Sequence, residues 1–532
     1  MSQMHSKEVA RRYREAYGDD APTSDLASEP IKTKLVAADW WIIIVLTLIA
    51  GGMRLYSLGY APLWFDELWT WRVSNQTNPS GLFHMLTEDI HLPGYFVITM
   101  AFLRAFGDGE FVMRLPAAIF GILSIPAAFV LGRRVFGRVV GAMVAIILTF
   151  SGAAFYYSQE ARPYSMMLFL GIVTSYLWYQ LYERVFVDEA PAGRLGVGLW
   201  LMLVVSCFTH YFSVLLTVFQ LAIFGYIAFK QTRGRKILVA YCLGLGVLAA
   251  LWAPVLGQQL QNLFSWTTVV PFLKATRDFV SFTFGTVSLS YNFQIIGAGF
   301  LCLICLLFLF RNGVGVFRAE SKREFYLSLI LAILWFCPFL FAEIVSIAVK
   351  PIFVSRYLLF CIPFAALALS IQVRRLAIPN LWHIAAAVLV VGIPGYYFEV
   401  GHFFTRPQRD QQGDWKKVIT EIHEQTPSSG KTVVLALTER LGVAQYYFSR
   451  VAPDLKIAGE ANTPQMVQGS VDNVLKQHPD HVVLFFGQMG QKQQRATVLV
   501  AAQLLSKSFG PADVIDAGPD SLVGALLFSA KH

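Results

Sequence analysis

The stretch from residue 112 to residue 157 reads VMRLPAAIFGILSIPAAFVLGRRVFGRVVGAMVAIILTFSGAAFYY and contains two long apolar runs separated by a basic turn. Each run, at 112–132 and at 139–157, has about the 20 residues that a helix needs to cross roughly 30 Å of hydrocarbon. The turn holds three basic residues, Arg133, Arg134 and Arg138. Because Lys and Arg are enriched in cytoplasmic loops, the stretch predicts two membrane-spanning helices joined on the cytoplasmic side.

The same pattern recurs along most of the chain. Hydrophobic residues make up 55% of the 532 residues and charged residues 14%, a balance that no water-soluble core of this length needs. Besides the two runs above, apolar runs lie near 39–58, 164–183, 196–209, 211–229, 237–257, 291–310, 325–348, 356–373 and 381–400. Together they predict a multi-span α-helical membrane protein with about eleven transmembrane helices.

A shorter apolar segment at 92–106, LPGYFVITMAFLRAF, decides the predicted orientation. If it crossed the membrane, the basic patch that begins at Arg133 would face outward, against the positive-inside tendency. As a helix it would also extend only about 22 Å. We therefore predict an interfacial helix in the first outer loop, with the N-terminus of the chain cytoplasmic and the C-terminus outside. The same tendency favours two spans within 196–229, whose middle residue is His210.

Three domains are predicted. Residues 1–37 are polar and basic, which indicates a cytoplasmic extension and no cleavable signal peptide. Residues 38–402 form the transmembrane domain. Residues 403–532 are predicted to be a small α/β domain outside the membrane, because the buried strand patterns KTVVLALT and DHVVLFFG alternate with the helical stretches DWKKVITEIHEQ and TPQMVQGSVDNVLKQH.

Two other classes of function are disfavoured by the composition. The net charge of +9 does not indicate nucleic-acid binding, because the basic residues form short patches between apolar runs, where membrane orientation explains them. Cys302 and Cys305 have the CxxC spacing of a metal or redox site. They lie in the apolar run GFLCLICLLFLF with no His or acidic residue nearby, so two lipid-facing cysteines are the better interpretation.

Ionisable residues gather at the predicted outer ends of the helices. Such groups are costly at membrane depth and tend to mark functional cavities. They are Asp66, Glu67, His91, Glu160, Arg162, His210, Lys274, Arg277, Lys350 and Arg356. The adjacent pair Asp66 and Glu67 stands among three tryptophans, which predicts an interfacial, half-dry setting for the two carboxylates. A solvated loop pair, or a cap for a following helix, is the alternative.

Structural roles are also open for the other members of this set. His91 precedes a Pro-containing helix start and has the position of a cap or a surface residue. Glu160 and Arg162 are close enough in sequence for a structural salt bridge. His210 fits a satisfied core histidine, and Arg356 with Tyr357 would suit a headgroup anchor.

Five segments, taken in order, resemble the bacterial membrane glycosyltransferases of the protein-mannosyltransferase and aminoarabinose-transferase type, whose fold class is GT-C. They are RLYSLGYAPLWFDELWTW (54–71), HLPGYF (91–96), RLPAAIFGILSIPAAFVLGRRVFGRVVGAMVA (114–145), YYSQEARPYSMMLFL (156–170) and THYFSVLLTVFQ (209–220). The resemblance covers roughly residues 40–230 by these motifs and 231–400 by architecture alone. It implies an inner-membrane enzyme that transfers a sugar, usually with inversion, from a polyprenyl-phosphate carrier to an acceptor on the periplasmic face.

The resemblance also implies roles for the carboxylate pair. Asp66 would be the catalytic base or the group that orients the acceptor, with Glu67 as its neighbour. A carboxylate within about 3 Å of an attacking hydroxyl can take its proton, and an adjacent carboxylate makes the pair more basic. The family commonly has His-Pro-Pro where this chain reads His91-Leu92-Pro93, and the lysine that the aminoarabinose branch has near that position is missing.

The remaining site residues are assigned by the chemistry of the donor. The leaving phosphate gains negative charge, so cations and donors near the membrane surface should bind it. The candidates are Arg356, Tyr357, Arg162, His91, Lys274 and Arg277. The predicted substrate cavity adds Glu160, His210, Trp64 and Tyr164. A divalent cation at Asp66, Glu67 and His91 is left open, and the Trp- and Phe-rich loop 258–290 is a candidate lid or acceptor-docking loop.

The expected partners are a polyprenyl-phosphate-linked sugar, membrane lipids, and a glycan, lipid or protein acceptor. The main alternative function is a transporter or flippase of a lipid-linked saccharide, which would show polar residues along the helices at mid-membrane and two similar halves. A structural partner in a cell-envelope complex would leave the Asp66–Glu67 pair without a task.

Overall fold

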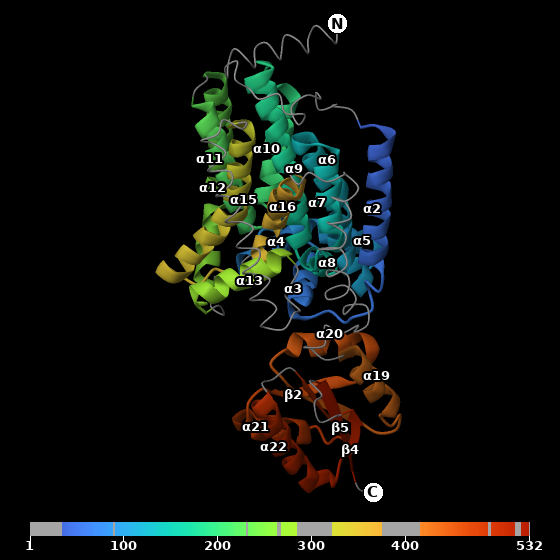
Figure 1. Cartoon of the computed structure of the whole chain (residues 1–532). Coiled ribbons are helices and arrows are strands. Elements are labelled where there is room, and N and C mark those ends of the chain that lie inside the picture. Colours follow the sequence, from blue (N-terminus) through green and yellow to red (C-terminus); the bar gives the residue numbers. More distant parts are fainter. Residues whose placement is uncertain are drawn as a thin grey trace. The chain divides into compact units, whose positions relative to one another are not determined.

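The structure, a computed structural model, describes residues 35–88, 91–229, 232–262, 268–284, 322–374, 415–487, 491–516 and 523–530 (Figure 1). The chain divides into two units. The first comprises Met1–Tyr56, Val73–Phe106 and Arg114–His402, and the second comprises Ser57–Arg72, Gly107–Met113 and Phe403–His532.

The first unit is helical. Its helices are α2 (Ala37–Leu55), α4 (Pro79–Glu88), α5 (Pro93–Phe106), most of α6 (Glu110–Phe136), α7 (Arg138–Phe150), α8 (Gly152–Ser158), α9 (Tyr164–Tyr182), α10 (Gly193–Cys207), α11 (Tyr211–Ala228), α12 (Thr232–Asn262), α13 (Phe272–Phe284), α15 (Lys322–Ala348) and α16 (Ile362–Arg374). Two short turns of other helix types, η1 (Glu183–Val187) and η2 (Ser355–Cys361), follow α9 and precede α16.

The helices agree with the hydropathy pattern. Among the described residues, 6 helices are long and apolar enough to cross a membrane, or 7 if α7 and α8, bent by 58°, form one broken span. Every predicted apolar run within the described ranges coincides with a helix or with such a pair. The runs at 291–310 and 381–400 and the N-terminal extension lie outside the described residues, so the total of about eleven spans stays a prediction.

Three uncertain segments of the sequence have a definite local structure. The segment predicted to be interfacial is α5, whose 14 residues would extend about 21 Å. The run 196–229 is broken into α10 and α11, with His210 as the residue that precedes α11. The predicted outer loop 258–290 is largely helical where it is described, because α12 continues to Asn262 and α13 begins at Phe272.

Helix α7 lies within the apolar core of the first unit. Its residues from Val140 to Thr149 are all buried, and α2 and α16 pack against it. A helix that is apolar on every side is expected to be surrounded by other elements. Further along the same core, Phe279 of α13 and Phe339 of α15 stack face to face, with ring centroids 4.6 Å apart.

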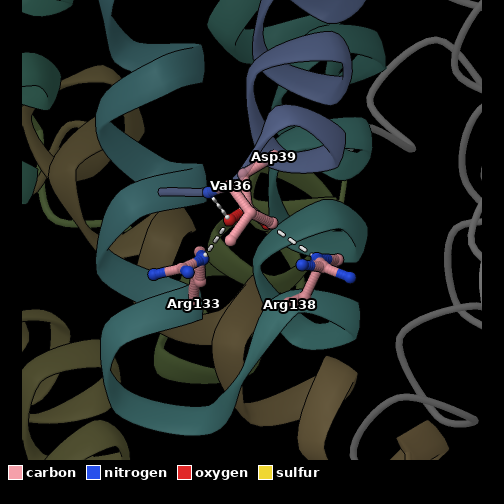
Figure 2. A network of polar contacts seen from close by, with 4 residues as sticks. All are labelled: Val36, Asp39, Arg133 and Arg138. Atoms are coloured by element: carbon pink, nitrogen blue, oxygen red, sulfur yellow. Dashed lines mark hydrogen bonds and ion pairs between the residues drawn. The ribbon is translucent and has the colours of Figure 1, made fainter. Parts of the chain in front are cut away.

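An ion network fixes the start of α2 to the turn between α6 and α7 (Figure 2). The buried carboxylate of Asp39 accepts hydrogen bonds from Arg138 Nε at 2.7 Å and from the Val36 backbone N–H at 2.9 Å, and it pairs with Arg133 Nε at 2.9 Å. The turn itself is made by Gly137, whose φ of +94° is a conformation that favours glycine. The network therefore joins three helices through one carboxylate.

The second unit contains the C-terminal α/β fold. Its strands are β1 (Thr432–Thr438), β2 (Lys456–Ala461), β3 (His481–Gly487), β4 (Asp513–Asp516) and β5 (Val523–Ser529), in the order β2-β1-β3-β5-β4. Strands β2, β1 and β3 are parallel, whereas β5 is antiparallel to both β3 and β4. Its helices are α19 (Trp415–Gln425), α20 (Leu441–Val451), α21 (Pro464–Leu475) and α22 (Gln491–Phe509).

The predicted strands and helices of this α/β fold are confirmed. The two stretches interpreted as buried strands are β1 and β3, which pair directly, and the two helical stretches are α19 and α21. The second unit also includes most of α3 (Phe65–Ser74) and the first residues of α6, which belong to the first loop. The predicted boundary at residue 403 lies outside the described residues and stays a prediction.

We expect Asp39→Asn to destabilise the protein by about 3–5 kcal/mol, because it leaves the buried Arg133 guanidinium without its counter-ion. Thermal unfolding of the purified protein in detergent would measure the loss. The matched control is Asp188→Asn at an exposed position, which should leave the midpoint unchanged. An unchanged midpoint for Asp39→Asn would show that the network contributes no net stability.

Candidate functional site

The first unit brings together predicted site residues from four separate segments. His91 lies two residues before α5, Arg162 two residues before α9 and His210 directly before α11, and Tyr357 belongs to η2. All four side chains are buried. Four polar side chains at or near helix ends thus meet in one place.

The closest polar contact joins His91 and Arg162. Nη2 of Arg162 lies 2.7 Å from Nε2 of His91. Since a guanidinium can only donate, Nε2 of His91 accepts and its ring proton is on Nδ1. The buried Arg162 guanidinium is therefore oriented by its contact with the His91 ring.

Aromatic rings surround this pair. The ring of His210 lies 5.9 Å from that of His91, 6.0 Å from Tyr164 and 4.9 Å from Tyr357. The guanidinium carbon of Arg356, which is half-buried, lies 5.6 Å from the centroid of the Tyr357 ring. The cluster therefore combines cations with aromatic faces in a site that is largely closed to water.

His210 is held neutral by its surroundings. Burial lowers its pKa well below the usual value, and the nearby His91, Arg162 and Arg356 lower it further. Its Nδ1 accepts the backbone N–H of Phe212 at 3.1 Å and so caps the start of α11. His210 therefore has a structural role as the cap of α11, and its ring also lines the cluster.

The entry to α5 requires a glycine. The backbone N–H of Gly94 donates to the carbonyl of Phe208 at 2.8 Å. A Cβ at Gly94 would lie 2.7 Å from that same oxygen, closer than real Cβ contacts. The sequence His-Leu-Pro-Gly therefore brings the start of α5 against the break between α10 and α11, next to His210.

Gln259 near the end of α12 is a supporting residue that the sequence did not indicate. Its buried amide nitrogen donates to the carbonyl of Leu86 at 2.7 Å and to that of His91 at 3.2 Å. The hydroxyl of Tyr211 donates to its amide oxygen, and Trp252 Nε1 donates to that hydroxyl at 3.2 Å. This chain of hydrogen bonds fixes the backbone of His91.

Arg54 was also missed, and it stabilises the break between α7 and α8. Its side chain is 1% exposed and donates to the carbonyls of Leu148 at 3.1 Å and Thr149 at 3.3 Å. A bent helix leaves carbonyls without intrahelical partners, and a cation suits the negative end of α7. The signal in the sequence was a single arginine, Arg54, near the end of the apolar run 39–58.

Gln159, in the loop before α9, connects that loop to the end of α2. Its amide nitrogen donates to the carbonyls of Arg54 at 3.1 Å and Tyr56 at 3.0 Å. It directly precedes Glu160, whose carbonyl accepts the backbone N–H of Arg162 at 2.7 Å in a tight turn. The loop that carries Arg162 is therefore tied to the end of α2.

The other predicted donor ligands lie on α13. The side chain of Lys274 is exposed. Arg277 pairs with the carboxylate of Asp278 at 2.6 Å. The structure therefore gives Arg277 an acidic partner on its own helix.

The two adjacent carboxylates lie in the second unit, in the first turn of α3, and have different tasks. Glu67 is fully buried, and its carboxylate accepts the backbone N–H of Trp64 at 3.3 Å. It therefore caps the helix, which was the alternative for the pair. Asp66 and Trp64 are half-buried. Asp66 is the more accessible acid of the two.

Among the described residues, no three His, Cys, Asp or Glu side chains gather as metal ligands. The capping bond of Glu67 uses one of its oxygens for the backbone. The divalent cation suggested for Asp66, Glu67 and His91 stays a prediction.

Comparisons with known proteins agree with this architecture. The family model of dolichyl-phosphate-mannose-protein mannosyltransferase matches residues 91–257. The chain is similar in fold to the crystal structure of ArnT from Cupriavidus metallidurans in the apo state, with 15% identity and a TM-score of 0.55 over 93% of this chain and 98% of that chain. The structure of ArnT from the same organism bound to undecaprenyl phosphate matches over the same shares with 15% identity and a TM-score of 0.50. A comparison with curated proteins gives no sequence match.

The resemblance predicted from the sequence is thus confirmed, and with it the GT-C fold of a multi-pass membrane protein. The matched region contains three of the four segments of the cluster, those with His91, Arg162 and His210. The segment with Tyr357 lies beyond it.

The lowered pKa of His210 predicts how stability depends on pH. Because the unfolded histidine binds a proton below about pH 6.5 and the folded one does not, the free energy of unfolding should fall as the pH drops below that value, by up to about 1.4 kcal/mol per pH unit. His210→Asn keeps a capping oxygen but cannot titrate, so denaturant unfolding between pH 7 and pH 5 should show a shallower slope. His84→Asn at an exposed position should keep the wild-type slope. Equal slopes for His210→Asn and the wild type would contradict this assignment.

Proposed function

We propose that this protein is a membrane glycosyltransferase that moves a sugar from a polyprenyl-phosphate donor to an acceptor at the periplasmic face of the inner membrane, with inversion at the anomeric carbon. The observation that carries the proposal is the buried cluster of cations and aromatic rings around Arg162 and His210, formed largely by residues that match the mannosyltransferase family. ArnT bound to undecaprenyl phosphate, which has a similar fold, supports a lipid-linked donor.

The cluster suits the phosphate of the donor. Arg162 is buried, positively charged and directed by His91, and Arg356 adds a second guanidinium beside Tyr357. Charge-assisted hydrogen bonds from guanidinium groups are strong and bind phosphate oxygens in pairs. In a site with little water they would stabilise the charge that develops on the leaving phosphate.

His210 contributes by staying neutral. A charged imidazole at this buried position would add a third cation beside the guanidinium groups of Arg162 and Arg356, which lower the pKa of His210. A neutral ring next to Tyr164 and Tyr357 instead provides an apolar, aromatic surface. We assign this surface, with Glu160 of the same unit, to the sugar.

Asp66 is the proposed base. The acceptor oxygen attacks the anomeric carbon, the bond from that carbon to the phosphate oxygen breaks, its electron pair stays on the phosphate, and the acceptor proton passes to the Asp66 carboxylate. Glu67 is less suited to this role because it is fully buried and caps α3. Half-buried Asp66 is the carboxylate that an acceptor can approach.

Asp66→Asn should lower transfer at least about 100-fold, because the amide cannot take the proton, while binding of undecaprenyl phosphate changes less than twofold. Turnover would be followed by mass spectrometry of carrier lipids and envelope glycans, with the purified variant in nanodiscs for binding. Asp188→Asn is the control. Wild-type turnover in Asp66→Asn would remove Asp66 from its role as the base.

Arg356→Gln should weaken binding of undecaprenyl phosphate by about 10- to 100-fold, the loss expected for one charge-assisted hydrogen bond. Acceptor choice should not change. Titration of the lipid into the protein in nanodiscs measures the affinity, with Arg495→Gln on the C-terminal α/β fold as an exposed control. An unchanged affinity would place the donor phosphate elsewhere.

A further inference from the structure

The segment that carries Asp66 is bound to helix α20 of the C-terminal α/β fold, within the second unit. The backbone N–H of Leu63 donates to the hydroxyl oxygen of Tyr447 at 2.5 Å. Both residues are 1% exposed, so water does not compete for this bond. It fixes the chain immediately before α3 begins.

Aromatic and cationic contacts hold α3 on both sides of Asp66. Before it, the ring of Phe65 lies 4.3 Å from the guanidinium carbon of Arg440. After it, the ring of Trp71 meets that of Tyr446 edge-on, with centroids 5.0 Å apart. Cation–π and edge-to-face contacts of this kind depend on orientation, so they restrict how α3 can rotate.

Arg450 also contacts residues 107–113, the second part of the first loop that belongs to this unit. Its guanidinium carbon lies 3.8 Å from the Tyr446 ring centroid and 5.1 Å from that of Trp71. The same side chain forms an ion pair with Asp108, just before α6. One arginine of α20 therefore contacts both the end of α3 and the residues just before α6.

The two parts of the first loop also pack against each other. A Cβ at Gly59 would lie 3.0 Å from the Cβ of Phe111, so the backbone there is in close contact with the start of α6. Lys416 of α19 pairs with Glu110 at 3.5 Å. The loop is therefore held as a single piece on two helices of the C-terminal fold.

The contacts begin at a point of the sheet that is suited to binding. After β1 the chain passes through α20 to β2 on one side of β1, and α21 then returns it to β3 on the other side. Open α/β sheets bind their ligands at such a switch point, outside the carboxyl ends of the strands. Arg440, two residues after β1, lies there, and its partner is Phe65 of the same chain.

We propose that α20 positions the Asp66 carboxylate for transfer, so that the C-terminal α/β fold is part of the enzyme's chemistry. Arg440, Tyr447 and Arg450 are positioning residues: they contact the segment around Asp66 and act through it. The proposal rests on the proposed function of Asp66. If the C-terminal α/β fold only stabilised the chain, its contacts could lie anywhere on its surface. Instead they lie on both sides of Asp66.

Steady-state kinetics of the full-length protein in nanodiscs tests this proposal. Tyr447→Phe and Arg450→Gln should each lower kcat at least tenfold per folded molecule, with the donor KM within twofold of wild type, because the donor phosphate is held by other residues. Arg450→Lys keeps a cation for Asp108 and should retain at least a third of the wild-type kcat. Arg495→Gln on α22 is the matched control. Wild-type kcat in both Tyr447→Phe and Arg450→Gln overturns the proposal.

Hydrogen exchange provides a measurement that does not depend on activity. In Tyr447→Phe the Leu63 amide loses its acceptor, so peptides covering 57–74 should exchange at least tenfold faster, while peptides of β1 and β3 stay as in wild type. Unchanged exchange in 57–74 overturns the proposal as well.

Asp66→Asn in the same kinetic assay separates the two proposals. If Asp66→Asn is inactive and the α20 variants have wild-type kcat, the α20 proposal fails alone. If Asp66→Asn keeps wild-type turnover, the proposed function of Asp66 fails, and the positioning role fails with it.

Discussion

The constraint that most of the first unit depends on is the need to pair backbone carbonyls where water cannot reach them. The break between α7 and α8 frees carbonyls in the interior, and the buried guanidinium of Arg54 supplies their donors. Gln159 then returns the connection to the carbonyls at the end of α2. The loop that carries Arg162 is thus held by side-chain hydrogen bonds to backbone carbonyls, at the break between α7 and α8 and at the end of α2.

Structural hydrogen bonds also separate the roles of the polar residues near the proposed site. Glu67 is used by the fold, as the cap of α3, and this leaves Asp66 as the accessible carboxylate. His210 both caps α11 and lines the cluster, and its neutral state lets Arg162 and Arg356 remain the charged groups. In both cases a structural hydrogen bond affects which polar groups the proposed transfer reaction can use.

The sequence predicted the helices and the strands β1 and β3 because hydropathy and its period depend only on local residues. The ordered motifs also contain His91, Arg162, Tyr164 and His210, and the chemistry of the donor added Tyr357; the structure brings these five side chains together. The supports were not predictable in this way. Arg54, Gln159 and Gln259 bind backbone carbonyls about a hundred residues or more away, and such partners leave no trace in side-chain type. The membership of 57–72 and 107–113 in the C-terminal unit was also missed, because it depends on contacts between aromatic residues far apart in the chain.

That last feature has a consequence for biosynthesis. Leu63 and Tyr447 are separated by 384 positions, so their bond can form only after the ribosome has made every residue between them, when β1 has been translated and β2 to β5 have not. Strand β5, which lies between β3 and β4, is the last strand to be translated. Pairings between such distant residues are slow to form, since the loop between them must first be closed. A nascent chain therefore carries its first loop unanchored for most of its synthesis, and maturation of the second unit is a late, post-translational event.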